Sequence, residues 1–405
     1  MTTAATEPLA LYVHWPFCVS KCPYCDFNSH VREKIDGPRW ERALLTELED
    51  EARRLGPRPL GSIFFGGGTP SLMDPATTAR IIERARALFP AESPPEISLE
   101  ANPTTVESAR LRDFRAAGVE RLSIGVQALD EAALKALGRA HGLAEALDAI
   151  GQAREIFPRM SFDLIYARPG QTMAAWMAEL DRAVDLAADH LSLYQLTIEP
   201  GTAFHTRHAR GELVLPEDDE AADLYEATTA RLAAAGLPAY EVSNHARPGF
   251  ECRHNLAYWT YADYAGIGPG AHGRVPTGPG GRREATRRAR APETWLDLVD
   301  THGHGRNEAV VVGQARAAEE ALMMGLRLDA GIDPVVFERR TGVALRDAVD
   351  ATRLAQAVEG GFVAGRTDRL VATPAGRLVL GALTAHLLAD DLDERFPEAR
   401  LLPGA

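Results

Sequence analysis

The 405-residue sequence lacks any long apolar run. A helix that spans a membrane needs about 20 consecutive apolar residues, and no stretch of this chain offers them. The first fifteen residues, MTTAATEPLALYVHW, also lack the basic segment and following apolar stretch that mark a secretory signal. These two absences predict a cytoplasmic protein.

Cysteine and positive charge are also scarce. The chain has four cysteines, three of them within eight positions. Such a cluster in a reducing compartment indicates metal or redox chemistry rather than a disulfide framework. Asp and Glu number 57 against 44 Lys and Arg, a formal net charge of −13. Because nucleic-acid binding relies on cationic side chains that face the phosphates, we expect no nucleic-acid partner.

Short apolar runs, rich in β-branched and aromatic residues, alternate with longer stretches of helical period. This pattern of repeated β/α units predicts an α/β fold, an open and partial (β/α)6 barrel of the TIM type. The predicted strands are LYVHW (11–15), SIFFG (62–66), EISLEA (96–101), RLSIGVQ (121–127), SFDLIYA (161–167) and HLSLYQLT (190–197). In such barrels the chemistry gathers at the carboxyl ends of the strands.

The pattern changes after about residue 205. Residues 254–273 are rich in Gly, Pro and aromatic residues, and GPGGRREATRRAR (278–290) is typical of a mobile loop. Helical periodicity returns from about residue 308 and predicts a small C-terminal helical domain resembling a winged helix. The expected domains are a barrel over 1–240, an intervening region over 241–307 and the helical domain over 308–405.

Cys18, Cys22 and Cys25 form the pattern C-x3-C-x2-C. Three protein thiolates leave one iron of a four-iron cubane, a [4Fe-4S] cluster, without a protein ligand. S-adenosylmethionine (SAM) offers an amino and a carboxylate group that can chelate this iron, and an electron passed to its sulfonium releases a deoxyadenosyl radical. The alternative is a zinc site completed by His14 or His30.

The cysteine spacing, followed by an aromatic residue, resembles the radical SAM superfamily. FFGGGTPS (64–71) resembles the loop with which that superfamily holds the methionine amino group, and successive glycines let a backbone approach a ligand closely. A glycine-rich turn by itself is more often a plain strand-to-helix connection. The resemblance implies that SAM is bound by Tyr12, Tyr24, Gly67, Gly68, Thr69, Glu100, Gln127, Arg139 and Asp163.

The same resemblance suggests roles for several of these side chains. Tyr24 would lie beside the adenine, and Arg139 would pair with the SAM carboxylate, as bidentate geometry favours. Glu100 and Asp163 would bind ribose hydroxyls or the ammonium group. Asp163 is the most telling of them, because an unpaired carboxylate within an apolar strand would be costly.

Further motifs, among them LGRAH, FDLIYARPGQT, HNLAYW and GIGPGAHG, resemble the oxygen-independent coproporphyrinogen III oxidases and, more closely, the haem chaperones of the HemW type. The oxidases carry C-x3-C-x2-C-x-C, whereas this chain has Phe27 at the last of these positions. H-N-x-x-Y-W, a motif associated with haem binding in the chaperones, is present over 254–259. The resemblance implies a chaperone that passes haem to acceptor proteins, with membrane-bound respiratory enzymes among the candidates.

In this interpretation His254 ligates the haem iron, while Tyr258 and Trp259 supply apolar faces for the macrocycle. Cys252 is an alternative or a second ligand. Without the resemblance, a histidine among aromatic side chains is more often a hydrogen-bonded core residue, and a single cysteine a small buried hydrophobe.

Several alternatives stay open at this point. Arg168 faces either the cavity or the solvent, and the arginines of 282–290 either form a solvated loop, the favoured interpretation, or pair with haem propionates. Oxidative decarboxylation of coproporphyrinogen III is the second candidate function, and the missing cysteine at position 27 counts against it. Radical modification of tRNA lacks a basic RNA-binding appendage. The sequence identifies no catalytic residue and leaves a homodimer open.

Overall fold

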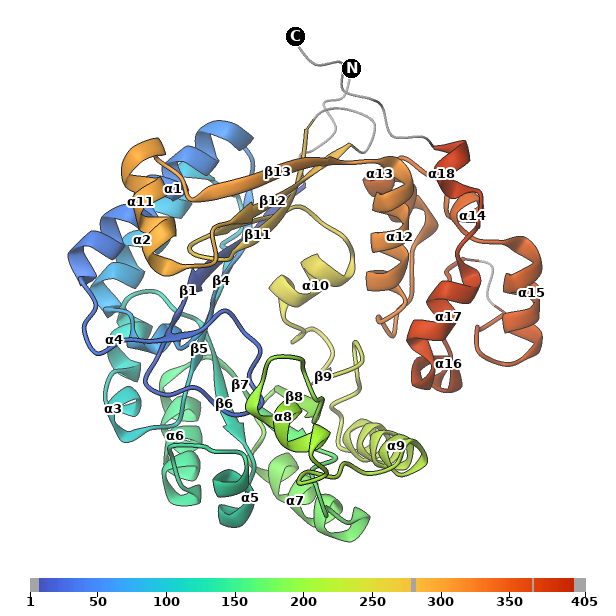
Figure 1. Cartoon of the computed structure of the whole chain (residues 1–405), viewed down its shortest axis with the longest axis horizontal. Helices are drawn as coiled ribbons and strands as arrows, with labels where there is room; N and C mark the ends of the chain where they lie inside the picture. The colour runs from blue at the N-terminus through green and yellow to red at the C-terminus, as the bar shows by residue number, and fades with distance from the viewer. Residues whose placement is uncertain (1–6, 278–281, 366–367, 397–405) are drawn as a thin grey trace.

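The computed structural model describes residues 7–277, 282–365 and 368–396. Within them an 11-stranded sheet runs in the order β13-β12-β11-β10-β1-β4-β5-β6-β7-β8-β9 (Figure 1). Its central strands are parallel and are the six that the sequence predicts: β1 (Leu9–Trp15), β4 (Leu60–Gly67), β5 (Glu96–Ala101), β6 (Arg121–Gln127), β7 (Arg159–Tyr166) and β8 (His190–Gln195). The predicted α/β barrel is confirmed.

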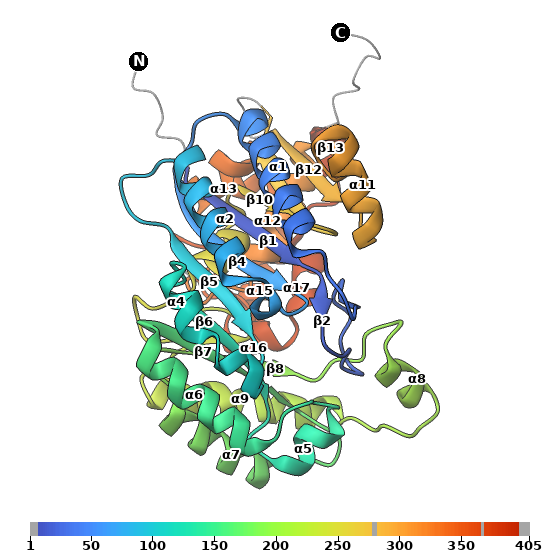
Figure 2. The ribbon, with the colours of Figure 1, turned by 90° about the vertical axis from the view of Figure 1, so that its left-hand side faces the viewer.

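Helices cover the outer face of these strands (Figure 2). They are α1 (Gly37–Leu55), α2 (Pro75–Leu88), α3 (Thr105–Ser108), α4 (Leu111–Ala116), α5 (Glu131–Ala136), α6 (Leu143–Ile156) and α7 (Met173–Leu186). The main apolar core lies between the two layers, where Leu11, Ile63 and Leu122 are fully buried. Parallel strands covered in this way are apolar along most of their length, which is why the sequence reveals them.

Five further strands extend the sheet at both edges. They are β9 (Asn244–Ala246), β10 (Tyr264–Ile267), β11 (His272–Pro276), β12 (Arg283–Arg288) and β13 (Arg306–Val312). β10 runs parallel to β1, and β11, β12 and β13 follow as antiparallel neighbours. A two-stranded pair, β2 (Phe17–Cys18) with β3 (His30–Val31), brackets the cysteine segment.

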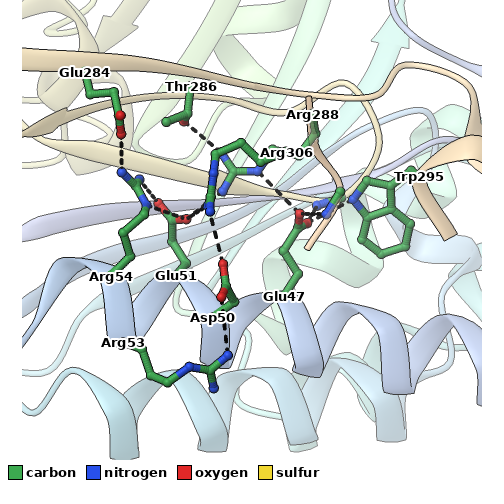
Figure 3. A network of polar contacts seen from close by, with 12 residues as sticks. Glu47, Asp50, Glu51, Arg53, Arg54, Glu284, Thr286, Arg288, Trp295 and Arg306 are labelled. Atoms are coloured by element: carbon green, nitrogen blue, oxygen red, sulfur yellow. Dashed lines mark hydrogen bonds and ion pairs between the residues drawn. The ribbon is translucent and has the colours of Figure 1, made fainter. Parts of the chain in front are cut away.

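The expectation of a loop over 278–290 is wrong for 283–288, which form strand β12; residues 278–281 lie outside the described part. Arg288 of β12 lies inside the protein because acidic side chains of α1 pair with it (Figure 3). Arg288 is fully buried, with its Nη2 atom 2.8 Å from Glu51 Oε2 and its Nε atom 3.5 Å from Glu47 Oε1. A buried charge is tolerated when it is paired in this way.

The remaining helices follow the barrel. They are α8 (Ala203–Ala209), α9 (Asp218–Ala234), α10 (Arg253–Trp259), α11 (Pro292–His302), α12 (Gln314–Gly325), α13 (Pro334–Thr341), α14 (Leu345–Ala348), α15 (Ala351–Glu359), α16 (Pro374–Leu378), α17 (Leu380–Leu387) and α18 (Leu392–Arg395). Helices α12 to α18 gather on one side of the molecule (Figure 1) around a second apolar core that includes Leu322, Phe337 and Leu387. The predicted C-terminal region is therefore helical. None of the helices in the described ranges is long and apolar enough to cross a membrane.

Candidate functional site

A cavity of about 340 Å³ lies at the carboxyl ends of the parallel strands. We call it the cluster cavity, after the three clustered cysteines that line it. The three clustered cysteines form one part of its wall. Eight of the nine residues predicted to bind SAM form another part, namely Tyr24, Gly67, Gly68, Thr69, Glu100, Gln127, Arg139 and Asp163. The structure thus brings residues from five strand ends and their loops into one site.

Each of the three thiols has a polar neighbour of its own. Thr69 Oγ1 donates to Cys18 Sγ at 3.3 Å, and Arg139 Nη1 donates to Cys22 Sγ at 3.2 Å. Cys25 Sγ lies 3.9 Å from the hydroxyl oxygen of Ser29. Donors directed at sulfur stabilise a thiolate and tune the potential of an iron-sulfur cluster. Burial raises the pKa of the Cys18 and Cys25 thiols, so a metal would have to displace their protons.

The two histidines that could complete a zinc site are already engaged. The ring nitrogens of His14 lie 3.2 Å from Tyr12 Oη and 2.9 Å from the carbonyl oxygen of Asn28. His30 Nε2 lies 3.3 Å from the side-chain oxygen of Asn28. In the described part of the chain, no three His, Cys, Asp or Glu side chains converge on a single metal ion. A cubane differs in presenting a separate iron to each thiolate.

Glu100 and Asp163 are two half-buried carboxyl groups that share the cavity. Burial, and then the negative charge of Asp163, raise the pKa of Glu100 to about 8. Burial also raises the pKa of Asp163 to about 6, although Ser123 Oγ donates a hydrogen bond to it at 3.3 Å. An ammonium or a pair of hydroxyl groups in the cavity would favour the ionised carboxylates. This environment suits the amino and ribose groups of SAM.

Polar atoms without a partner also point to a ligand. Gln127 Oε1 and Arg139 Nε are buried and make no hydrogen bond to the described residues. Gln127 further adopts the left-handed conformation, with φ of 73°, which is uncommon outside glycine and typical of functional sites. Arg139 is held in place from the other side, because its Nη2 atom lies 2.6 Å from Asn102 Oδ1 and 2.7 Å from the Gly125 carbonyl oxygen. The residues therefore fit a polar, charged cofactor.

The glycine loop that follows β4 needs its glycines. Gly67 has φ of +114°, a conformation that side chains rarely adopt. A Cβ atom on Gly68 would lie 2.7 Å from the carbonyl oxygen of Phe17, in the cysteine segment. The loop can therefore approach the cluster segment closely only while it lacks side chains.

Several polar residues of the cavity were missed by the sequence analysis, among them Asn102, Glu107, Ser123 and His141. Asn102 links two predicted residues, since its Nδ2 atom also donates to Thr69 Oγ1 at 2.9 Å. It lies two positions after Glu100, and alternate residues of a strand share one face, so the spacing in LEANP could have indicated it. Glu107 and His141 follow strand ends without any comparable pattern.

A second cavity, of about 520 Å³, adjoins the first. Phe27, Gly67 and Glu100 line both cavities. The other residues of the second cavity are Tyr12, His14, Asn28, Tyr258, Tyr264, Gly270, Ala271, His272, Arg287 and Arg290. Tyr12 is predicted to bind SAM. It lines this second cavity and does not line the cluster cavity.

Asn28 joins the segments that surround the second cavity. Its Nδ2 atom donates to the carbonyl oxygens of Pro269 and Arg290, each at 3.0 Å. The cluster segment is thereby fixed both to the connection before β11 and to the connection after β12.

His254 is buried behind Tyr258, to which it is hydrogen-bonded, and it does not line either of the two cavities. Its Nδ1 atom lies 3.0 Å from Ser62 Oγ and its Nε2 atom 3.0 Å from Tyr258 Oη, and burial lowers the pKa of the imidazole to about 3. Cys252 is also buried, which raises the pKa of its thiol to about 11. Ligation of haem by His254 stays a prediction, and it requires the exchange of one of these hydrogen bonds for iron.

Arg168 faces neither the cluster cavity nor open solvent. It is nearly buried and forms an ion pair with Glu179 of α7. It lies beside a separate cavity at α5, α7 and α8. A structural role in joining β7 to α7 accounts for its position.

Comparison with known proteins agrees with this architecture. The model of the radical SAM superfamily matches residues 12–183, and that of the HemN C-terminal domain matches residues 314–379. The heme chaperone HemW of Escherichia coli is 39% identical over 95% of this chain and 99% of its own length. The chain belongs to the HemW family. Another relative, the mitochondrial radical S-adenosyl methionine domain-containing protein 1 of Mus musculus, is 44% identical over 81% of this chain and 75% of its own length.

This chain shares its fold with the coproporphyrinogen III oxidase HemN. The solved structure of the Escherichia coli enzyme matches this chain with a TM-score of 0.77 and 24% identity, over 94% of this chain and 90% of that one. At this identity the likeness concerns the fold alone. The radical SAM barrel and the helical C-terminal region are therefore common to both branches.

Proposed function

We propose that this HemW family member is a cytoplasmic haem chaperone that carries a [4Fe-4S] cluster and SAM and passes haem to acceptor proteins, membrane-bound respiratory enzymes among them. The observation that carries the proposal is the pairing of two adjoining cavities. One is lined by three thiols and half-buried carboxyl groups, the other by aromatic rings and arginines. The near full-length likeness to HemW supports the same function.

In this proposal Cys18, Cys22 and Cys25 hold the cluster. SAM, when bound beside it, supplies a source of a deoxyadenosyl radical. Glu100 and Asp163 accept hydrogen bonds from its amino and ribose groups, and Arg139 pairs with its carboxylate, the guanidinium being fixed by Asn102 and Gly125. Tyr24, which lies within 3.4 Å of Arg139 through its hydroxyl group, closes one side of the pocket.

The haem motif contributes to the second cavity through Tyr258, whose ring lines it. His254 holds this ring in place by the hydrogen bond between its Nε2 atom and Tyr258 Oη. His254→Ala is therefore expected to lose or shift the haem absorption band while cluster and SAM binding persist. An unchanged haem spectrum in a folded variant would remove the motif from the haem site.

The runner-up is oxidative decarboxylation of coproporphyrinogen III, favoured by the fold shared with the oxidase. Phe27, which lies at the junction of the two cavities, stands where the oxidases have a fourth cysteine. The test is anaerobic reconstitution of the cluster, followed by haem titration and a decarboxylation assay on the same preparation. Stoichiometric haem binding without turnover supports the chaperone, whereas repeated conversion of coproporphyrinogen III into protoporphyrinogen IX would make the runner-up correct.

A further inference from the structure

We infer that haem binds in the second cavity, with His272 rather than His254 as the ligand of its iron and with Arg287 and Arg290 paired to its propionates. The inference rests on the proposed haem chaperone function and names the site that such a function needs. It assigns a role to the GIGPGAHG segment (266–273). The last two residues of this segment, His272 and Gly273, are the first two residues of strand β11.

The cavity has the size and lining of a cofactor site. Its volume of about 520 Å³ lies within the roughly 300–1,000 Å³ that is usual for small-molecule and cofactor pockets. Phe27, Tyr12, Tyr258 and Tyr264 contribute aromatic surface. The rings of Tyr258 and Tyr264 pack edge to face with centroids 4.6 Å apart, which gives the cavity a firm aromatic wall. A flat macrocycle gains most from such surfaces.

His272 is the imidazole of this wall that is available to a metal. The other cavity histidine, His14, has both ring nitrogens engaged by Tyr12 and Asn28. His272 is exposed, and in the described ranges no hydrogen bond involves its ring. Partial burial of the ring, followed by the positive charges of Arg287 and Arg274, lowers the pKa of His272, and the neutral imidazole is the form that binds a metal.

The tyrosines of the cavity are less suited to iron. Burial raises the pKa of Tyr12 and Tyr258 well above the usual value, and each phenol oxygen is already close to a histidine nitrogen. An iron-bound tyrosinate would therefore require loss of a hydrogen bond as well as deprotonation. Ligation by His272 requires neither the loss of a hydrogen bond nor the deprotonation of a phenol.

Two arginines are placed for the carboxylates of haem. Arg287 lies directly opposite His272 in the pairing of β11 with β12, so both side chains project from the same face of the sheet. Arg290, just past the end of β12, is exposed and makes no ion pair to the described residues. Arg287 has a half-exposed competitor, Glu308, at 3.7 Å. Such a surface pair is weak, and a propionate can replace it.

The position of the second cavity fits a ligand that the protein releases to an acceptor. Phe27 is 61% exposed and lines both cavities, so a bound macrocycle would lie against the same side chain that borders the cluster. His272 and Arg290 both lie at the outer side of the site, as their exposure shows. Haem held there can leave without passing through the SAM pocket.

The first test compares His272→Ala with His205→Ala, a control that removes an exposed imidazole of α8 away from both cavities. Haem is titrated into the reconstituted protein, and ligation is followed by absorption and electron paramagnetic resonance. We expect His272→Ala to lose the histidine-ligated spectrum, with affinity reduced about tenfold or more, or about 1.4 kcal/mol. Added imidazole should restore the spectrum in this variant, and His205→Ala should match the wild type.

The second test concerns the arginines. Haem dimethyl ester should bind the wild type about tenfold more weakly than haem, because the charge-assisted pairs are lost. In an Arg287→Gln, Arg290→Gln double variant, haem and its ester should bind equally. Unchanged ligation in a folded His272→Ala variant, or continued preference for free propionates in the double variant, overturns the inference. If the wild type itself binds no haem, the proposed chaperone function fails as well.

Discussion

Glu47 of α1 and Arg288 of β12 are both fully buried, although 241 positions separate them in the chain, and Arg288 Nε lies 3.5 Å from Glu47 Oε1 (Figure 3). Glu47 also accepts hydrogen bonds from the backbone N–H groups of Gly268 and Gly305, each at 2.7 Å, and from Trp295 Nε1 at 3.0 Å. One carboxylate thus joins α1 to the connections at Gly268 and Gly305 and to helix α11. Gly268 belongs to the segment that leads to His272.

Glu47→Gln should reduce the free energy of unfolding by about 3–5 kcal/mol, because the variant leaves Arg288 as a buried charge without its full set of partners. Glu49→Gln is a matched control on the same helix, since Glu49 forms a largely exposed pair with Arg84. Its loss should cost at most about 1 kcal/mol. Urea denaturation of both variants measures the difference, and equal costs would show that the buried network contributes little.

Cys22→Ala should abolish the iron-sulfur cluster. The wild type, reconstituted without oxygen, should bind about four irons per chain, as a cubane requires. Cys252→Ala is the control, because Cys252 is buried and does not line the cluster cavity. Iron content and the visible absorption spectrum report the result. Zinc in place of iron in both proteins, with no iron-sulfur spectrum, would contradict the assignment.

Asp163→Ala should weaken SAM binding and leave the cluster intact. Loss of one charge-assisted hydrogen bond costs about 1.5–3 kcal/mol, which is roughly a 10- to 150-fold change in the dissociation constant. Asp181→Ala, at an exposed position of α7, is the control. Isothermal titration of the reconstituted proteins with SAM compares them. Equal affinities in folded proteins would remove Asp163 from the pocket.

The stability of the cofactor-free protein should fall as pH rises from about 4 to about 8. Folding raises the pKa of Glu100 from 4.5 to about 8 and that of Asp163 from 3.8 to about 6. The folded state then binds more protons than the unfolded state across this window, so stability is present in full at low pH and is lost as each carboxyl group ionises.

Glu100→Gln removes the larger of these two contributions. The variant should show a flatter profile of melting temperature against pH, and at pH 8 it should be more stable than the cofactor-free wild type. A profile as steep as that of the wild type would mean that Glu100 does not keep its proton in the folded chain.

The barrel and the cluster cavity follow from local patterns. β1 and β4 are predictable because parallel strands are apolar on both faces, and the cysteines and glycines form short contiguous motifs. β12 is different, since Arg283 to Arg288 carry the charges of a solvated segment. Only the positions of Glu47 and Glu51, far away in the chain, decide that Arg288 is buried.

The second cavity could not be predicted for a similar reason. Tyr12, Phe27, Tyr258 and His272 come from four separate segments and share no spacing rule. His254 is an instructive case, because an imidazole beside aromatic residues has the same sequence signature whether it binds iron or supports a tyrosine. In this structure the ring of His254 is buried and makes two hydrogen bonds, while its ligation of iron stays a prediction.

The side-chain amide of Asn28, three positions after Cys25, binds both Pro269 and Arg290 through their carbonyl oxygens. A single amide therefore joins the segment that we propose to hold the cluster to the rim of the second cavity. If oxygen destroys a cluster held there, the cysteine segment is no longer fixed by metal. The carbonyl groups of Pro269 and Arg290, which Asn28 of that segment binds, are then held less rigidly. Aerobic damage at the thiols would then change the conformation of the second cavity before oxygen reacts with any residue that lines it.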